Sequence, residues 1–165
     1  MALFGRTTID DPDLRQLTGR RRVLASGRSP VGQVLGLADA LMFAGPDGTR
    51  ELPWHEIATG GWTRETNTLR WTTVDGEQGE LELVETGLLP DLFNERVTAS
   101  IAVVRTVSLA GAGSAVITAR RNLGDDAAAL VWSATPGRGT TPEQVAADPV
   151  VGDELARLRA EYDVG

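Results

Sequence analysis

The sequence contains no cysteine, no lysine, a single histidine and no long apolar run. The absence of cysteine excludes disulfides, thiolate metal sites, iron–sulfur clusters and a cysteine nucleophile, and it fits a reducing compartment. No stretch approaches the roughly 18 apolar residues of a membrane-spanning helix. Arg6 is followed by Asp10 and Asp11 rather than by an apolar segment, so we expect no signal peptide and a cytoplasmic location.

All 16 positively charged residues are arginines, and the 23 acidic residues give a formal net charge of −7. An acidic field repels nucleic acid and anionic lipid, so we expect no nucleic-acid partner and consider membrane binding unlikely. The absence of lysine is typical of a GC-rich genome and says nothing about function.

The first half of the chain alternates between apolar and polar residues, which predicts strands. A short helix should run from Asp11–Pro12 to Thr18–Gly19, within an N-terminal arm over residues 1–19. Asp75–Gly76 is a hairpin signal. The predicted strands cover residues 23–26, 33–38, 40–44, 49–58, 69–74 and 80–84.

A longer apolar pattern begins at Pro90. Leu92, Phe93, Val97, Ile101 and Val104 recur at spacings of three and four, which predicts an amphipathic helix over residues 90–105. This stretch is rich in β-branched residues, which favour strands, but the periodicity and the proline favour the helix. Three further strands are predicted over residues 106–109, 114–121 and 128–134.

The C-terminal segment should be a broken helix. Thr141 and Gln144 form a capping box, and Asp148–Pro149 restarts the helix. We interpret the stripe of Val151, Leu155, Leu158 and Tyr162 as core, with a homodimer seam as the alternative.

Residues 20–105 resemble a known family. The segments that carry the resemblance are Val34–Phe43, a glycine turn, then Leu52–Pro53–Trp54–His55–Glu56–Ile57, two more strands and a helix. This order is similar to that of bacterial pleckstrin-homology-like domains, which are related in shape to GRAM domains. Ala38–Asp39–Ala40 replaces the family's usual polar and basic residues, so the chemistry of that loop does not transfer.

The resemblance implies an α+β fold: a partly open, antiparallel β-barrel of about seven strands closed by helix 90–105. Residues 106–165, three strands and the broken helix, would be an extension packed on the barrel. Likeness of fold does not transfer a function.

Catalytic and metal-binding patterns are weak. His55 lacks a second histidine for zinc chemistry, and its neighbour Glu56 should point to the opposite face of a strand. The glutamates at positions 77, 80, 82 and 85 fit a solvated strand, and Gly111–Gly113 fits a hairpin rather than a dinucleotide loop. We therefore expect no catalytic residue, no metal and no cofactor.

Two groups of residues are candidates for binding. Arg20, Arg21, Arg22 and Arg28 border the first loop, where lipid-binding relatives of the resembled family hold phosphorylated head groups; a solvated strand end is the favoured interpretation. The tryptophans could be core or site, and Trp62, beside Gly60–Gly61, is the one expected to be most exposed.

These observations leave three hypotheses. The first is a non-catalytic module that docks a protein or peptide, with Trp62 and the arginine loop as candidate contacts. The second is an enzyme or small-ligand carrier with a pocket near Trp54, His55 and Glu56. The third and weakest is recruitment to anionic lipid through residues 20–28.

Overall fold

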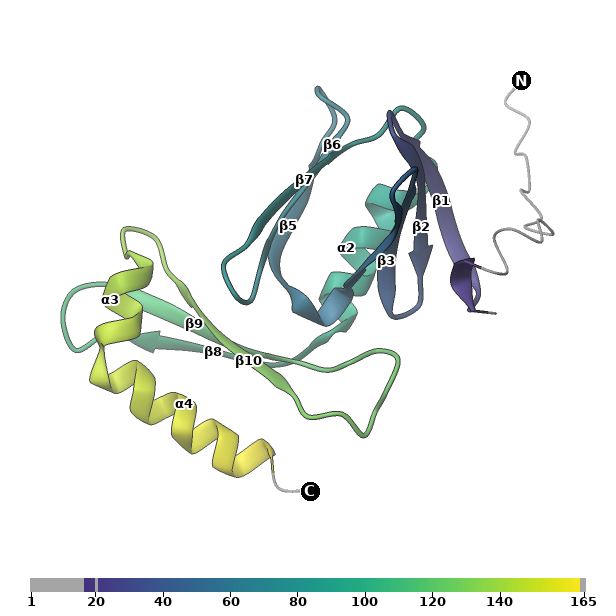
Figure 1. Ribbon diagram of the computed structural model, residues 1–165. Helices are drawn as coiled ribbons and strands as arrows, with labels where there is room; N and C mark the ends of the chain where they lie inside the picture. The colour runs from purple at the N-terminus through teal and green to yellow at the C-terminus, as the bar shows by residue number, and fades with distance from the viewer. Residues whose placement is uncertain (1–16, 20, 164–165) are drawn as a thin grey trace.

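The computed structural model describes residues 17–19 and 21–163, which form three antiparallel sheets with few helices, an α+β fold (Figure 1). The predicted N-terminal helix lies outside the described residues except at its end, where Gly19 has the positive φ of a helix terminus. The first sheet has the order β1-β2-β3-β4. Its strands are β1 (Val23–Ser29), β2 (Gly32–Leu37), β3 (Ala40–Gly45) and β4 (Gly48–Pro53).

The second sheet begins after a corner that the sequence did not predict. The expected single strand over residues 49–58 is interrupted by the 3-10 turn η1 (Trp54–Glu56). Pro53 has no N–H for the ladder, and the turn places Trp54 in the core, with its backbone N–H donating to the carbonyl of Asp39 at 3.1 Å. The strands that follow, β5 (Ile57–Thr63), β6 (Thr68–Thr73) and β7 (Gln78–Glu82), pair in sequence order.

The predicted helix 90–105 is wrong at its C-terminal end. Helix α2 (Leu89–Ala99) stops at Ser100, and Ile101 begins strand β8 (Ile101–Ser108). Ile101, Val103 and Val104 are β-branched, and pairing with strand β9 (Ser114–Arg120) satisfies their backbone. Strand β10 (Val131–Pro136), which starts three residues later than predicted, completes a third sheet of order β10-β9-β8.

The last two helices cover one face of the third sheet (Figure 1). Helix α3 (Pro142–Ala147) starts with the predicted capping box, in which Thr141 and Gln144 bond reciprocally. Helix α4 (Pro149–Tyr162) starts at Asp148, whose carboxylate accepts from the N–H groups of Val150 and Val151.

The main core lies between the first two sheets and α2. Trp54 is fully buried there, packs edge-on against Phe93 with ring centroids 5.9 Å apart, and donates Nε1–H to the carbonyl of Leu37 at 2.9 Å. A separate core forms between the third sheet and helices α3 and α4, and it contains Ile117, Val151 and Leu158.

A buried arginine joins the third sheet to helix α2 and to the second sheet. Arg120 is 4% exposed at the end of β9. Its guanidinium donates to the carbonyl of Val97 and the hydroxyl of Ser100, both at 2.8 Å, and to the carbonyl of Ala58 at 3.0 Å. Because the Val97 carbonyl belongs to the last turn of α2, the cation also faces the negative end of that helix.

Candidate functional site

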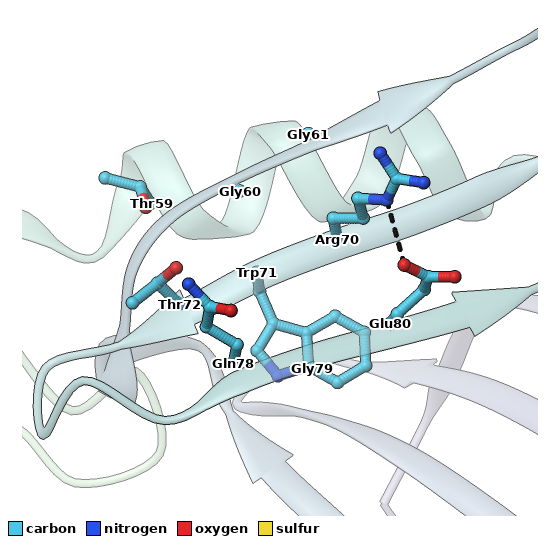
Figure 2. Close-up of a pocket in the computed structure, with 9 residues that line it drawn as sticks. All are labelled: Thr59, Gly60, Gly61, Arg70, Trp71, Thr72, Gln78, Gly79 and Glu80. Carbon is cyan, nitrogen blue, oxygen red and sulfur yellow. Dashed lines mark hydrogen bonds and ion pairs between the residues drawn. The ribbon is translucent and has the colours of Figure 1, made fainter.

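Three of the hollows formed by the described residues border the second sheet. The largest, which we call the polar hollow, has a volume of about 540 Å³ and lies across strands β5, β6 and β7 (Figure 2). Its lining residues are Thr59, Gly60, Gly61, Arg70, Trp71, Thr72, Gln78, Gly79 and Glu80.

The register of the sheet explains why this surface is hollow. Gly60, Trp71 and Gly79 lie opposite one another on the three strands, and Gly61 lies opposite Arg70. Three of the positions therefore carry no side chain. Gly79 is required for close packing, because a Cβ at this position would overlap the Trp71 indole, which lies against it in Figure 2.

Polar groups line the rest of the polar hollow. Arg70 Nε donates to Glu80 Oε2 at 3.0 Å across neighbouring strands. Thr59, Thr72 and Gln78 form the next row of the sheet. Since the Arg70–Glu80 pair is more than half exposed, it contributes little to stability and remains accessible to a binding partner.

A second hollow, of about 240 Å³, lies where strand β7 faces the hairpin tips of the first sheet. We call it the Phe43–Trp71 hollow, because these two rings stack there with centroids 5.9 Å apart and planes inclined by 22°. Leu81 and the exposed Val31 add apolar surface, and Arg50 adds a charge.

The third hollow, of about 270 Å³, contains Trp62 and lies between the end of β5 and the start of α2. The Trp62 side chain is half-buried and packs against the main core. Arg64, Asn67, Pro90 and Asp91 complete this Trp62 hollow.

Trp54 and His55 lie away from the described hollows. Trp54 is a core residue. The half-buried His55 is in η1, and its buried Nδ1 atom has no hydrogen-bond partner among the described residues. The sequence left open whether the side chains of the Trp/His segment belong to the core or to a binding site. The Trp54 side chain belongs to the core.

The arginine loop is largely engaged in ion pairs. Arg21 pairs with Asp39, at 3.3 Å, and with Glu51, and Arg28 pairs with Glu85 at 2.9 Å. Arg22 is exposed, and Arg20 lies outside the described residues. The described cations therefore do not converge on one site.

The stripe on the last helix is mostly internal. Val151 is 4% exposed and Leu158 is fully buried against the third sheet, Leu155 is half-buried, and Tyr162 lies beside Trp132 at the exposed end.

Sequence reasoning missed two features. Arg120 was hidden because it shares one face of its strand with Ser114 and Thr118, and a strand face with several polar residues is normally assigned to solvent. Arg70 was treated as an ordinary exposed residue, although its position between glycine and glutamate on neighbouring strands places it in the polar hollow.

Within residues 17–19 and 21–163, no His, Asp and Glu side chains gather in a group of three or more that could hold a metal ion. Across the same part of the chain, every helix is too short or too polar to cross a bilayer. Comparison of the chain with protein-family models, with curated proteins and with solved structures found no match.

Proposed function

We propose that this chain is a non-catalytic, pleckstrin-homology-like module that docks a protein or peptide partner on the face formed by β5, β6 and β7. Three features support the fold part of the proposal. They are four antiparallel strands followed by three, a helix packed on both sheets, and the bridge between Arg28 and Glu85 that links the end of the first sheet to the segment after β7.

The observation that carries the functional proposal is the polar hollow. Pockets for small molecules are concave and bury most of their ligand. This hollow instead spreads over three strands, with glycine backbone, threonine, glutamine and an arginine–glutamate pair on its surface (Figure 2). Such a surface offers a polymer backbone both donors and acceptors, and two of its lining residues, Trp71 and Arg70, are of the types enriched at protein interfaces.

A small polar ligand is the second candidate, and the size of the polar hollow favours it. A volume of about 540 Å³ lies within the usual range for ligand sites. The lipid hypothesis has less support, because Arg21 and Arg28 already have carboxylate partners.

Selection of displayed random peptides on the purified chain tests the docking proposal. Peptides that are enriched should bind the wild-type chain in calorimetry and should bind Gly61→Phe at least about tenfold more weakly. A Cβ at Gly61 meets no atom within 4 Å, so the phenyl group should fill the hollow without disturbing the fold.

Gly111→Phe is the matched control, since Gly111 is equally open and lies in the turn between β8 and β9. It should bind the same peptides as the wild type does. Enrichment of no peptide, or equal affinity for Gly61→Phe and the wild type, would rule out docking on this face.

A further inference from the structure

Strand β7 has an unpaired edge beside the Phe43–Trp71 hollow. The N–H of Leu83 donates to the carbonyl of Asn67, and the carbonyl of Glu77 accepts from the N–H of Thr73. The N–H and C=O groups of the odd-numbered residues from 77 to 83 therefore point toward β6. By alternation, the N–H and C=O groups of Gln78, Glu80 and Glu82 point the other way. Within the described part of the chain these groups have no hydrogen-bond partner.

Strand β1 shows how this edge can be paired. Just beyond β7, the backbone N–H of Val84 donates to the carbonyl of Arg28 at 2.7 Å, and the backbone N–H of Arg28 donates to the carbonyl of Glu85 at 2.9 Å. The chain then turns away after Ser29, where β1 ends and the turn to β2 begins. The pairing stops there, and the edge along residues 78–82 continues without a neighbour.

The space beside this edge is suited to an added strand. Glu80 and Leu81 belong to β7 and also line the Phe43–Trp71 hollow. On the inner face, Leu81, Phe43 and the 71%-exposed Val31 present apolar surface. On the outer face, Glu82 is an exposed carboxylate, and Glu80, two residues before it, is exposed and also pairs with Arg70.

We infer that an extended peptide segment adds to the β7 edge as a further strand, with basic side chains on its outer face and apolar side chains on its inner face. The backbone of Gln78, Glu80 and Glu82 supplies the hydrogen bonds. One apolar side chain enters the Phe43–Trp71 hollow, and the basic ones lie opposite Glu80 and Glu82. The chain's net charge of −7 also attracts a basic segment.

This inference rests on the proposed docking function and names the chemistry of its partner. Its probe is the blocked peptide acetyl-Thr-Arg-Leu-Arg-Val-Arg-Thr-amide, titrated into the full chain. Two further peptides of the same sequence serve as matched controls. One is N-methylated at its odd-numbered residues and the other at its even-numbered residues. Because only one edge of the added strand faces β7, one N-methylated peptide should bind like the parent and the other at least about tenfold more weakly.

Amide hydrogen exchange gives the second measurement. Saturation with the probe should slow exchange of the backbone amides of Gln78, Glu80 and Glu82 on the wild-type chain. Glu80→Pro removes one outward N–H and should weaken binding, and proline is tolerated on an edge strand at such a position. Glu80→Gln keeps the N–H and should weaken binding less.

The outcomes separate this inference from the docking proposal. Unchanged exchange at the three amides, equal affinity of both N-methylated peptides, or no binding of the probe would overturn strand addition at β7. Docking on the sheet face would still stand if selected peptides lost affinity for Gly61→Phe. The docking proposal would fall with the inference if Gly61→Phe also had no effect or if the selection enriched no peptide.

Discussion

Arg120 is a buried cation whose described hydrogen-bond partners include no carboxylate. Burial lowers the pKa of its guanidinium, but arginine remains charged in proteins, so the charge is held by the carbonyls of Val97 and Ala58 and the hydroxyl of Ser100. Those oxygens come from two separate elements, α2 and β5. One side chain thus holds the third sheet against both.

Replacement of this residue should be costly. We expect Arg120→Met to lower the free energy of unfolding by about 2–4 kcal/mol, because the carbonyls of Ala58 and Val97 and the hydroxyl of Ser100 each lose the hydrogen bond from Arg120. Urea denaturation measures the change. Arg121→Met is the control, since Arg121 is exposed, and its effect should stay within about 0.5 kcal/mol. Equal stability of the two variants would show that the Arg120 contacts contribute nothing.

Gly79 tests the packing below the polar hollow. Gly79→Val should destabilise the fold by about 1–3 kcal/mol, because its Cβ would overlap the Trp71 indole. Gly61→Val is the matched change in the same sheet, with open space around the new Cβ, and thermal unfolding compares the two. A Gly79→Val variant as stable as Gly61→Val would mean that the indole moves aside at no cost.

At the scale of elements, helix α4 contains a short charge network. The Arg157 guanidinium hydrogen-bonds Glu154 at 2.6 Å and holds the pKa of that carboxyl below its ordinary value, with a smaller contribution from Arg105. A depressed pKa means that the interaction is present above the carboxyl's ordinary pKa. It is lost as the pH falls through the lower, folded value.

Removal of the guanidinium should reverse this shift. We expect Arg157→Gln to raise the pKa of Glu154 toward its ordinary value, measured by NMR titration of the side-chain carboxyl. Arg159→Gln, on the same helix, should leave that pKa unchanged. The account of this pair is wrong if the two variants titrate alike.

The elements also show what the sequence could predict. The hairpin at Asp75–Gly76, the capping box at Thr141 and the restart at Asp148 depend on local chemistry, and the structure has each of them. The end of α2 could not be predicted in this way. Ile101 and Val104 fit helical spacing, but tertiary pairing with β9 decides their conformation and leaves Val104 56% exposed.

The candidate site was less predictable than the fold. The sequence analysis singled out Trp62 as the tryptophan expected to be most exposed, but in the structure it is half-buried, as Trp71 and Trp132 are, and it packs against the main core. The polar hollow depends on the register that aligns Gly60, Trp71 and Gly79 on three strands. Register between strands is set by the whole sheet, so no single stretch of sequence reveals it.

At the scale of the whole molecule, the two cores have different roles. The first two sheets and α2 carry the three described hollows, all of them bordered by β5, β6 or β7. The third sheet buries one face under α3 and α4 (Figure 1). It is held to helix α2 and strand β5 through Arg120. The loop between β9 and β10 also reaches the main core, where Leu123 packs and Gly124 lies against Asp39.

The four tryptophan indoles lie in different regions of the molecule. Trp54 is in the main core, Trp132 hydrogen-bonds Asp163 at the third sheet, and Trp62 and Trp71 line the hollows of the second sheet. Each indole N–H gives its own NMR signal, so the main core and the third sheet each carry one reporter and the second sheet carries two.

The most direct test is therefore a titration of the ¹⁵N-labelled chain with a selected peptide, followed through these four indole signals. Docking on the second sheet predicts that the Trp71 signal shifts, with or without that of Trp62, while those of Trp54 and Trp132 stay in place. Saturable binding that shifts Trp132 and leaves Trp62 and Trp71 unchanged would contradict the account.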